Sequence, residues 1–260
     1  MTDFCYCVRI TGAPPQKPSI QCQGQDLYMN GNRPPITTTI VGMNVAVFVV
    51  MALMGVSPLH PTTAQLVTWG ANWGPLSLGD QPWRILACNY IHIGIIHILL
   101  NMWCLWNLGS LAERIFDPWT YVLVYTFCGL GGSITSLWWH PQVKGAGASG
   151  AIFGLAGALI AALYLGRLPI SKQAIQGTLK SLLTFAGYNL FFGLAPGIDA
   201  SAHVGGLLTG LALGAVLAKH LTAPPEIRDG WRRGVFVAAL VILLAAYVYV
   251  RHSAGIIAPS

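Results

Sequence analysis

Gly147-Ala148-Ser149-Gly150 opens an apolar stretch that continues to residue 166. A helix of about 20 apolar residues is long enough to cross a bilayer, so this stretch is predicted to span a membrane. A serine at the start of such a helix is costly to keep in lipid, and polar residues at membrane depth are functional candidates by default. Ser149 is therefore the first candidate for a functional residue.

The composition of the whole chain agrees with a membrane location. The 260 residues are 54% hydrophobic and only 8% charged, with a mean hydropathy of +0.60. A soluble domain carries about 25% charged residues, so lipid must cover most of this surface. The net charge of +6 does not indicate a nucleic-acid partner, because the basic residues fall between apolar segments and form no single patch.

Six further stretches have similar apolar character and length. The seven predicted segments are residues 36–56, 93–112, 119–139, 147–166, 178–195, 200–219 and 234–250. The fifth is the least hydrophobic. The sequence therefore predicts an all-α polytopic membrane protein, with short loops that suit a bacterial inner membrane.

Residues 1–35 are polar and rich in Pro, Gly and Gln, and they contain no apolar core of a cleavable signal peptide. We expect a cytosolic tail. Its three cysteines, Cys5, Cys7 and Cys22, lack the spacing of a structural zinc site and are expected to be free thiols. No metal is expected anywhere in the chain.

The Lys and Arg residues predict the orientation. With a cytosolic N-terminus, only Arg84, Lys144 and Arg251 of the 14 basic residues lie outside, and the other 11 lie inside. This bias follows the positive-inside rule. The second, fourth and sixth segments then run inward, so the polar residues near their starts all lie in the outer half of the membrane. These residues are His97, Asn101, Ser149 and His203.

Four polar residues at one depth suggest one site. A serine becomes a nucleophile when a base takes its proton, and His203 is the candidate base. His97 and Asn101 are four residues apart and share a helix face, so both could donate hydrogen bonds to an oxyanion. Asp199, one turn before His203, could orient the imidazole, but it is expected in the preceding loop. A Ser-His dyad is therefore favoured over a triad.

Each residue alone has a simpler interpretation. Ser149 could be a packing serine, and Asn101 could merely join helices. His92 is expected to have a structural role near the interface. The pairs Gly150–Gly154 and Gly206–Gly210 could mediate oligomerisation, although we favour contact between the fourth and sixth segments. The oligomeric state stays open.

The combination of motifs resembles the rhomboid intramembrane serine proteases over residues 36–219. The shared motifs, in family order, are Gly70-Ala71-Asn72-Trp73-Gly74-Pro75, Trp83-Arg84, His97-x-x-x-Asn101, Gly147-Ala148-Ser149-Gly150 and Ala202-His203-x-x-Gly206. The resemblance implies a six-helix core, to which a seventh helix at 234–250 is appended. Residues 220–233 would be a cytosolic loop, and residues 234–260 would hold the seventh helix and a short external C-terminus.

The resemblance also implies roles for individual residues. Ser149 would be the nucleophile and His203 the base, while His97, Asn101 and the Ser149 backbone N–H would bind the oxyanion. The implied supporting residues are Gly147, Gly150, Phe153, Gly206, Gly210, Trp83 and Arg84. Phe153 stands where many members have Tyr, so its ring could pack on His203 but offers no hydroxyl.

The predicted function is hydrolysis of peptide bonds in or next to the transmembrane segment of single-pass membrane proteins. The partners would be such substrates and membrane lipids, with no cofactor. One alternative is a catalytically silent member that binds transmembrane clients, although such members usually lack the serine or the histidine. A transporter is disfavoured, because the chain shows neither paired broken helices nor an inverted repeat.

Overall fold

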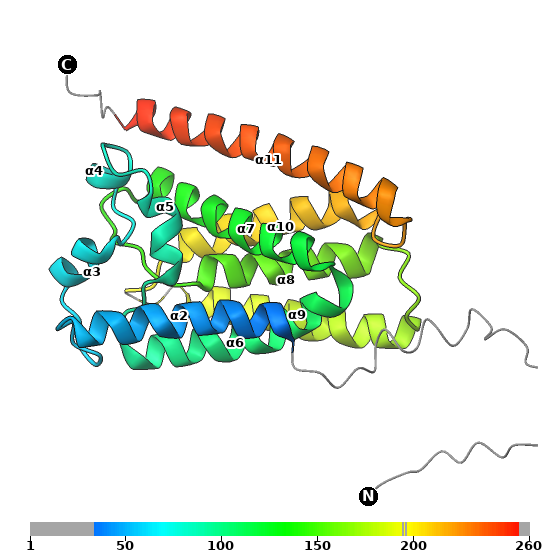
Figure 1. Cartoon of the computed structure of the whole chain (residues 1–260), viewed down its shortest axis with the longest axis horizontal. Helices are drawn as coiled ribbons and strands as arrows, with labels where there is room; N and C mark the ends of the chain where they lie inside the picture. The colour runs from blue at the N-terminus through cyan, green and yellow to red at the C-terminus, as the bar shows by residue number, and fades with distance from the viewer. Residues whose placement is uncertain (1–33, 194, 196, 255–260) are drawn as a thin grey trace, which may run out of the picture. The chain divides into compact units, whose positions relative to one another are not determined.

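The computed structural model describes residues 34–193, 195 and 197–254. The predicted tail cysteines Cys5, Cys7 and Cys22 and most of the expected tail 1–35 lie outside the described residues. Within the described part, seven long helices run alongside one another (Figure 1). They are α2 (Pro35–Leu53), α6 (Gly94–Ile115), α7 (Pro118–Trp139), α8 (Ser149–Leu165), α9 (Lys172–Phe192), α10 (Ala200–Ala218) and α11 (Pro225–Ser253).

The predicted all-α polytopic architecture is confirmed. In the described part, α2, α6, α7, α10 and α11 are each long and apolar enough to cross a membrane. The helix α8 is apolar but has 17 residues. Its neighbour α9 begins at Lys172, six residues before the predicted apolar segment, because Ser171 caps it by accepting a hydrogen bond from the Ala174 backbone N–H.

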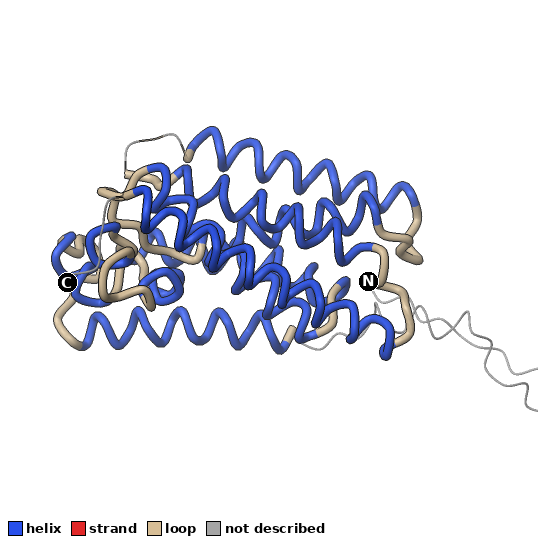
Figure 2. Tube along the Cα trace, turned by 90° about the horizontal axis from the view of Figure 1, so that it is seen from above, coloured by secondary structure: helices blue, strands red, loops and turns tan. Residues whose placement is uncertain are grey.

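The helix α8 lies at the centre of the bundle. It packs most extensively against α10 and also contacts α7, α6 and α9 (Figure 1). Figure 2 shows that helices make up nearly all of this bundle and that loops join them at its two ends. Most of its residues are buried, whereas α9 buries only Leu182 and Ala186. The start of α8, where Ser149 lies, is therefore enclosed by neighbouring helices.

Residues 57–92, which join α2 to α6, form no long helix. The structure divides them into the short helices α3 (Thr63–Trp69), α4 (Gly74–Ser77) and α5 (Arg84–Ala87) and the 3₁₀ helix η1 (Cys88–Tyr90). Gly70, in the left-handed conformation with φ of 110°, ends α3.

The helix α11 begins at Pro225, nine residues earlier than the predicted seventh segment. Most of the predicted loop 220–233 is therefore helical. The predicted start marked where the apolar residues begin, but the charged first turns are helical too. Arg232 forms an ion pair with Asp117, the N-cap of α7, at 2.6 Å and thereby holds this end of α11 on the bundle.

Candidate active site

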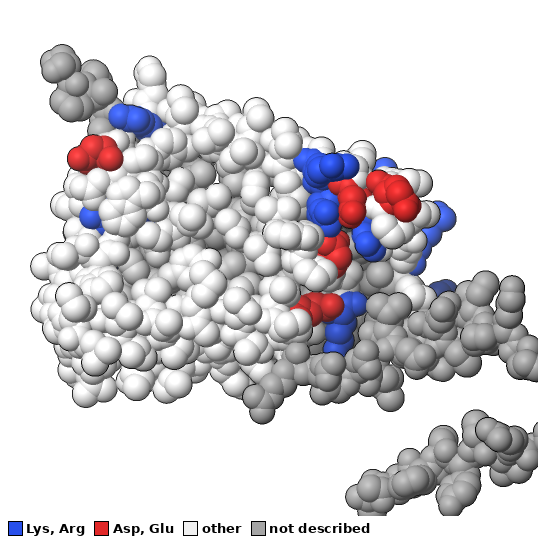
Figure 3. Space-filling model, in the orientation of Figure 1, with Lys and Arg blue, Asp and Glu red and all other residues white. Residues whose placement is uncertain are grey.

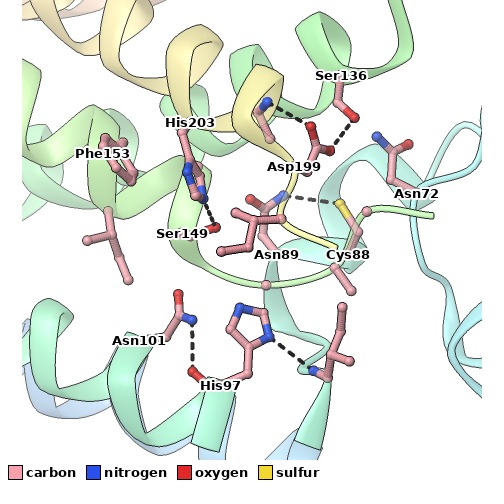
Figure 4. Close-up of a pocket in the computed structure, with 18 of the residues that line it drawn as sticks. Asn72, Cys88, Asn89, His97, Asn101, Ser136, Ser149, Phe153, Asp199 and His203 are labelled. Carbon is pink, nitrogen blue, oxygen red and sulfur yellow. Dashed lines mark hydrogen bonds between the residues drawn. The ribbon is translucent and has the colours of Figure 1, made fainter. Parts of the chain in front are cut away.

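Ser149 and His203 lie in direct contact. Ser149 is the first residue of α8 and His203 lies in the first turn of α10, and the Ser149 Oγ and His203 Nε2 atoms are 2.9 Å apart (Figure 4). Only 8% of His203 is exposed, and its Nδ1 has no hydrogen-bond partner among the residues described. The pair can therefore exchange a proton without any movement of either helix.

Glycines allow α8 and α10 to approach this closely. A Cβ atom at Gly206 would collide with the carbonyl oxygen of Gly150, and one at Gly210 would collide with that of Gly154. The two G-x-x-x-G pairs therefore face each other inside one chain. The internal contact favoured from the sequence is present, and it sets the distance between the serine and the histidine.

Gly147 shapes the backbone just before the serine. Its φ is 128°, a conformation that residues with a Cβ rarely adopt, and an added Cβ would lie 2.6 Å from the His97 imidazole. The chain can therefore turn into α8 immediately beside His97.

His97 and Asn101 lie across from Ser149 on α6 (Figure 4). The Ile93 backbone N–H donates to Nδ1 of His97 at 3.2 Å, which leaves the ring proton on Nε2. One amide N–H of Asn101 donates to the His97 carbonyl oxygen at 2.9 Å, and the second N–H of that amide remains. Both side chains can therefore donate hydrogen bonds on this side of the serine.

The Phe153 ring stacks on the imidazole of His203. The ring centroids are 4.4 Å apart and the planes differ by 18°. The centroid of the Phe153 ring also lies 5.8 Å from that of Phe185 on α9. An apolar residue at this position therefore restrains the histidine by packing alone.

Asp199 does not contact the His203 ring by a hydrogen bond. It caps α10 and accepts hydrogen bonds from the Ala202 backbone N–H at 3.1 Å, the Ser201 hydroxyl at 2.6 Å and the Ser136 hydroxyl at 2.5 Å. Its carboxylate thus joins the start of α10 to α7. No hydrogen bond links this carboxylate to the imidazole among the residues described, and the Ser-His dyad stays a prediction.

Arg84 and Trp83 lie in the segment before α6, away from the serine. Arg84 is buried, and its guanidinium donates to the carbonyl oxygens of Val67 at 2.6 Å and Ala71 at 3.1 Å. The Trp83 ring covers Gly70, where a Cβ would lie 2.6 Å from the ring. These contacts hold the short helices together.

Further polar residues near the serine make contacts that the sequence did not predict. His92 is buried, and its Nε2 accepts a 3.4 Å hydrogen bond from the Ala148 backbone N–H, directly before Ser149. Burial, together with the nearby His97, lowers the pKa of His92 to about 3, so its ring stays neutral. His92 was expected to have a structural role near the interface, and the structure shows that it holds the backbone directly before Ser149.

Cys88 also makes polar contacts beside the site. Its Sγ lies 3.2 Å from the Ser133 hydroxyl, and the Asn89 amide donates to the same hydroxyl at 3.4 Å. The sequence offered one signal, since Ser133 and Ser136 are three residues apart near the C-terminal end of an apolar segment.

A cavity of about 490 Å³ opens beside the serine, and we call it the site cavity. The cavity is lined by all four candidate residues, Ser149, His203, His97 and Asn101. Asp199 and its hydrogen-bond partner Ser136 line it too. This volume falls within the usual range of ligand and substrate pockets. The four candidate residues therefore share one accessible compartment.

A comparison with family models matches residues 79–220 of the chain to the Rhomboid domain. Rhomboid protease GluP of Bacillus subtilis is 32% identical over 224 residues, which are 86% of this chain and 41% of GluP. RHOMBOID-like protein 4 of Arabidopsis thaliana is 37% identical over 160 residues, 61% of this chain and 40% of that protein. The chain thus spans less than half of these two relatives.

A third relative matches over most of both chains. Rhomboid protease AarA of Providencia stuartii is 27% identical over 237 residues, which are 82% of this chain and 82% of AarA. Both matches to bacterial proteases extend beyond the residues of the domain.

Proposed function

The chain belongs to the rhomboid family, and from this premise we propose that it is an intramembrane serine endopeptidase. Its substrates would be single-pass membrane proteins, cut in or next to their transmembrane segments. The observation that carries the proposal is the 2.9 Å contact between Ser149 Oγ and His203 Nε2 in a cavity within an apolar helix bundle.

In the proposed mechanism, Ser149 gives its proton to His203 Nε2 as its Oγ attacks the carbonyl carbon of the substrate. His203 then returns this proton to the leaving amine, and water hydrolyses the resulting acyl-enzyme by the same steps. For this, the resting ring must carry its proton on Nδ1. Phe153 stacking would hold the ring in the required orientation.

The oxyanion would be bound by three groups, the Nε2–H of His97, the free amide N–H of Asn101 and the backbone N–H of Ser149. The first N–H groups of a helix have no partner within it and lie at the positive end of its dipole. Because such donors stabilise charge that develops only in the transition state, they raise the rate rather than substrate affinity.

We propose that the N-terminus is cytosolic and that the site cavity opens to the opposite side. Charged side chains gather at the end of the bundle where α11 begins, which Figure 3 shows on the right. This distribution supports the orientation through the positive-inside rule. The expected bacterial inner membrane stays a prediction, and the relatives come from both bacteria and a plant.

The proposal is tested by cleavage of a single-pass substrate in liposomes. We expect Ser149→Ala and His203→Ala each to lower kcat by about 10⁴-fold or more, because each removes half of the proton-transfer pair. Ser110→Ala and His60→Ala are the matched controls, since neither residue lines the site cavity. Full cleavage by Ser149→Ala would refute the proposal. Substrate that binds all variants but is never cut would favour the client-binding alternative.

A further inference from the structure

Two charged side chains line the site cavity in the described part of the chain, Lys144 and Asp199. The carboxylate of Asp199 is occupied, because Oδ1 accepts from Ser201 and Ala202 and Oδ2 accepts from Ser136. Lys144 forms no ion pair with any residue described. These neutral donors leave Asp199 negative but turn its oxygens toward α7 and the start of α10, so the charge that remains free to pair with a substrate side chain is the Lys144 ammonium.

Backbone hydrogen bonds hold the residues that follow Lys144 in the chain, between it and Ser149. The N–H and carbonyl of Gly145 both pair with Asn72, each at 2.8 Å, and the Gly147 N–H donates to the Cys88 carbonyl oxygen at 2.9 Å. The Lys144 ammonium lies 5.1 Å from the centroid of the Trp73 ring, a cation–π distance. Its place at the wall is therefore defined by both backbone and ring.

The surroundings strengthen the effect of this charge. Much of the remaining wall is aliphatic, and it includes Ile93, Ile96, Leu100, Val143 and Ile198. Charges attract more strongly beside low-dielectric walls than in water. Lys144 and Ser149 line the same cavity, so a substrate that reaches the serine passes within the field of Lys144.

We propose that Lys144 is a specificity residue that selects substrates with a carboxylate side chain close to the cut bond. The inference rests on the proposed function and adds to it the charge of the preferred substrate segment. An Asp or Glu near the cut bond would pair with the Lys144 ammonium, while the ring of Trp73 remains beneath it.

The test uses full-length protein in liposomes and a series of substrates that differ at one position, Asp or Asn, moved stepwise along both sides of the cut bond. At one or two positions we expect Asp to raise kcat/KM by about fivefold through a lower KM, the size of a partly exposed ion pair. Lys144→Met should bring this Asp/Asn ratio to one. In the Lys144→Glu variant the Asp/Asn ratio should fall below one. A further substrate with Lys at the same position should be the one that this variant cuts best.

Arg251→Met is the matched control, because Arg251 is predicted at the same end of the bundle and does not line the site cavity. It should keep the wild-type Asp/Asn ratio. A ratio near one at every position in the wild type, or one that Lys144→Met leaves unchanged, would overturn the inference. An equal effect of Lys144→Met on Asp and Asn substrates would instead indicate contact with lipid headgroups and also overturn it.

Failure of the proposed function is recognised separately. The same substrates are titrated against the Ser149→Ala protein, and their Kd values are measured. If the wild type cuts none of them, the function is wrong, but an Asp/Asn difference in Kd that disappears in Ser149→Ala/Lys144→Met still supports the charge preference. No such difference in Kd would reject it.

Discussion

At the scale of single residues, Asn101 offers the sharpest test of the proposed oxyanion site. Asn107, on the same helix, makes the same local hydrogen bond, from its amide to the carbonyl oxygen four residues earlier, but it is exposed and lies outside the site cavity. We expect Asn101→Ala to lower kcat by about 10²–10³-fold with little change in KM, because the lost donor acts in the transition state. Asn107→Ala should leave kcat at the wild-type value. Equal kcat values for the two variants in a liposome assay would contradict the assignment.

Asp199 separates a dyad from a triad. In a Ser-His-Asp triad, changing the acid to its amide lowers kcat by about 10⁴-fold. Here Asn can still cap α10, and Asp199 makes no hydrogen bond to His203. We therefore expect Asp199→Asn to retain kcat within about tenfold of the wild type. A loss as large as that of His203→Ala would show that the carboxylate acts on the imidazole.

The sequence could predict which residues meet but not all of their contacts. Ser149, His203 and His97 follow from apolar segments that alternate in direction, because polar groups near the starts of alternate membrane segments must lie at one depth. The partner of Asp199 could not be predicted in this way. Ser136 is 63 positions away, and only the packing of α7 on α10 shows that its hydroxyl reaches the carboxylate.

At the scale of helices, the contact between α8 and α10 depends on backbone proximity. A Cβ at Gly210 would collide with the Gly154 carbonyl oxygen, which belongs to a helix backbone and cannot move aside. We expect Gly210→Ala to destabilise the protein by about 1–3 kcal/mol, as overpacked cores do, and to lower activity by separating Ser149 from His203. Gly187→Ala on α9 is the control, because nothing lies within 4 Å of its Cβ position. Thermal unfolding in detergent compares them, and equal melting temperatures would contradict the packing argument.

Helix boundaries were less predictable than helix contacts. Hydropathy locates the part of a helix that lipid surrounds, so the apolar stretch 234–250 gave the centre of α11 correctly. It could not show that the helix begins at Pro225, because residues 225–233 are stabilised by polar contacts. Within this stretch, Arg228 and Arg232 both pair with Asp117.

At the scale of the whole molecule, α11 is attached to the bundle near both of its ends. Arg232 pairs with Asp117 at one end, and the Tyr247 hydroxyl donates to the Ser77 carbonyl oxygen at 2.8 Å near the other. Between them, Phe236 packs on Phe127 with ring centroids 5.2 Å apart. The helix lies outside the matched family domain, yet these contacts make it part of the same folded unit.

The charged attachment of α11 should depend on pH. Burial raises the pKa of Asp117, but hydrogen bonds from Thr120 and the charges of Arg232 and Arg228 outweigh it, so the pKa lies below the usual value. A lowered pKa gives stability that is fully present above the unfolded value of about 3.9 and is lost as the pH falls through the folded value. At pH 7 we therefore expect Asp117→Asn to melt at a lower temperature than the wild type. The difference should shrink as the pH falls below about 4.

Asp229→Asn is the matched control, because Asp229 pairs with the same arginines within α11 and so joins no two helices. A difference between wild type and Asp117→Asn that stayed constant down to the acid limit would show that the ion pair does not hold α11 in place.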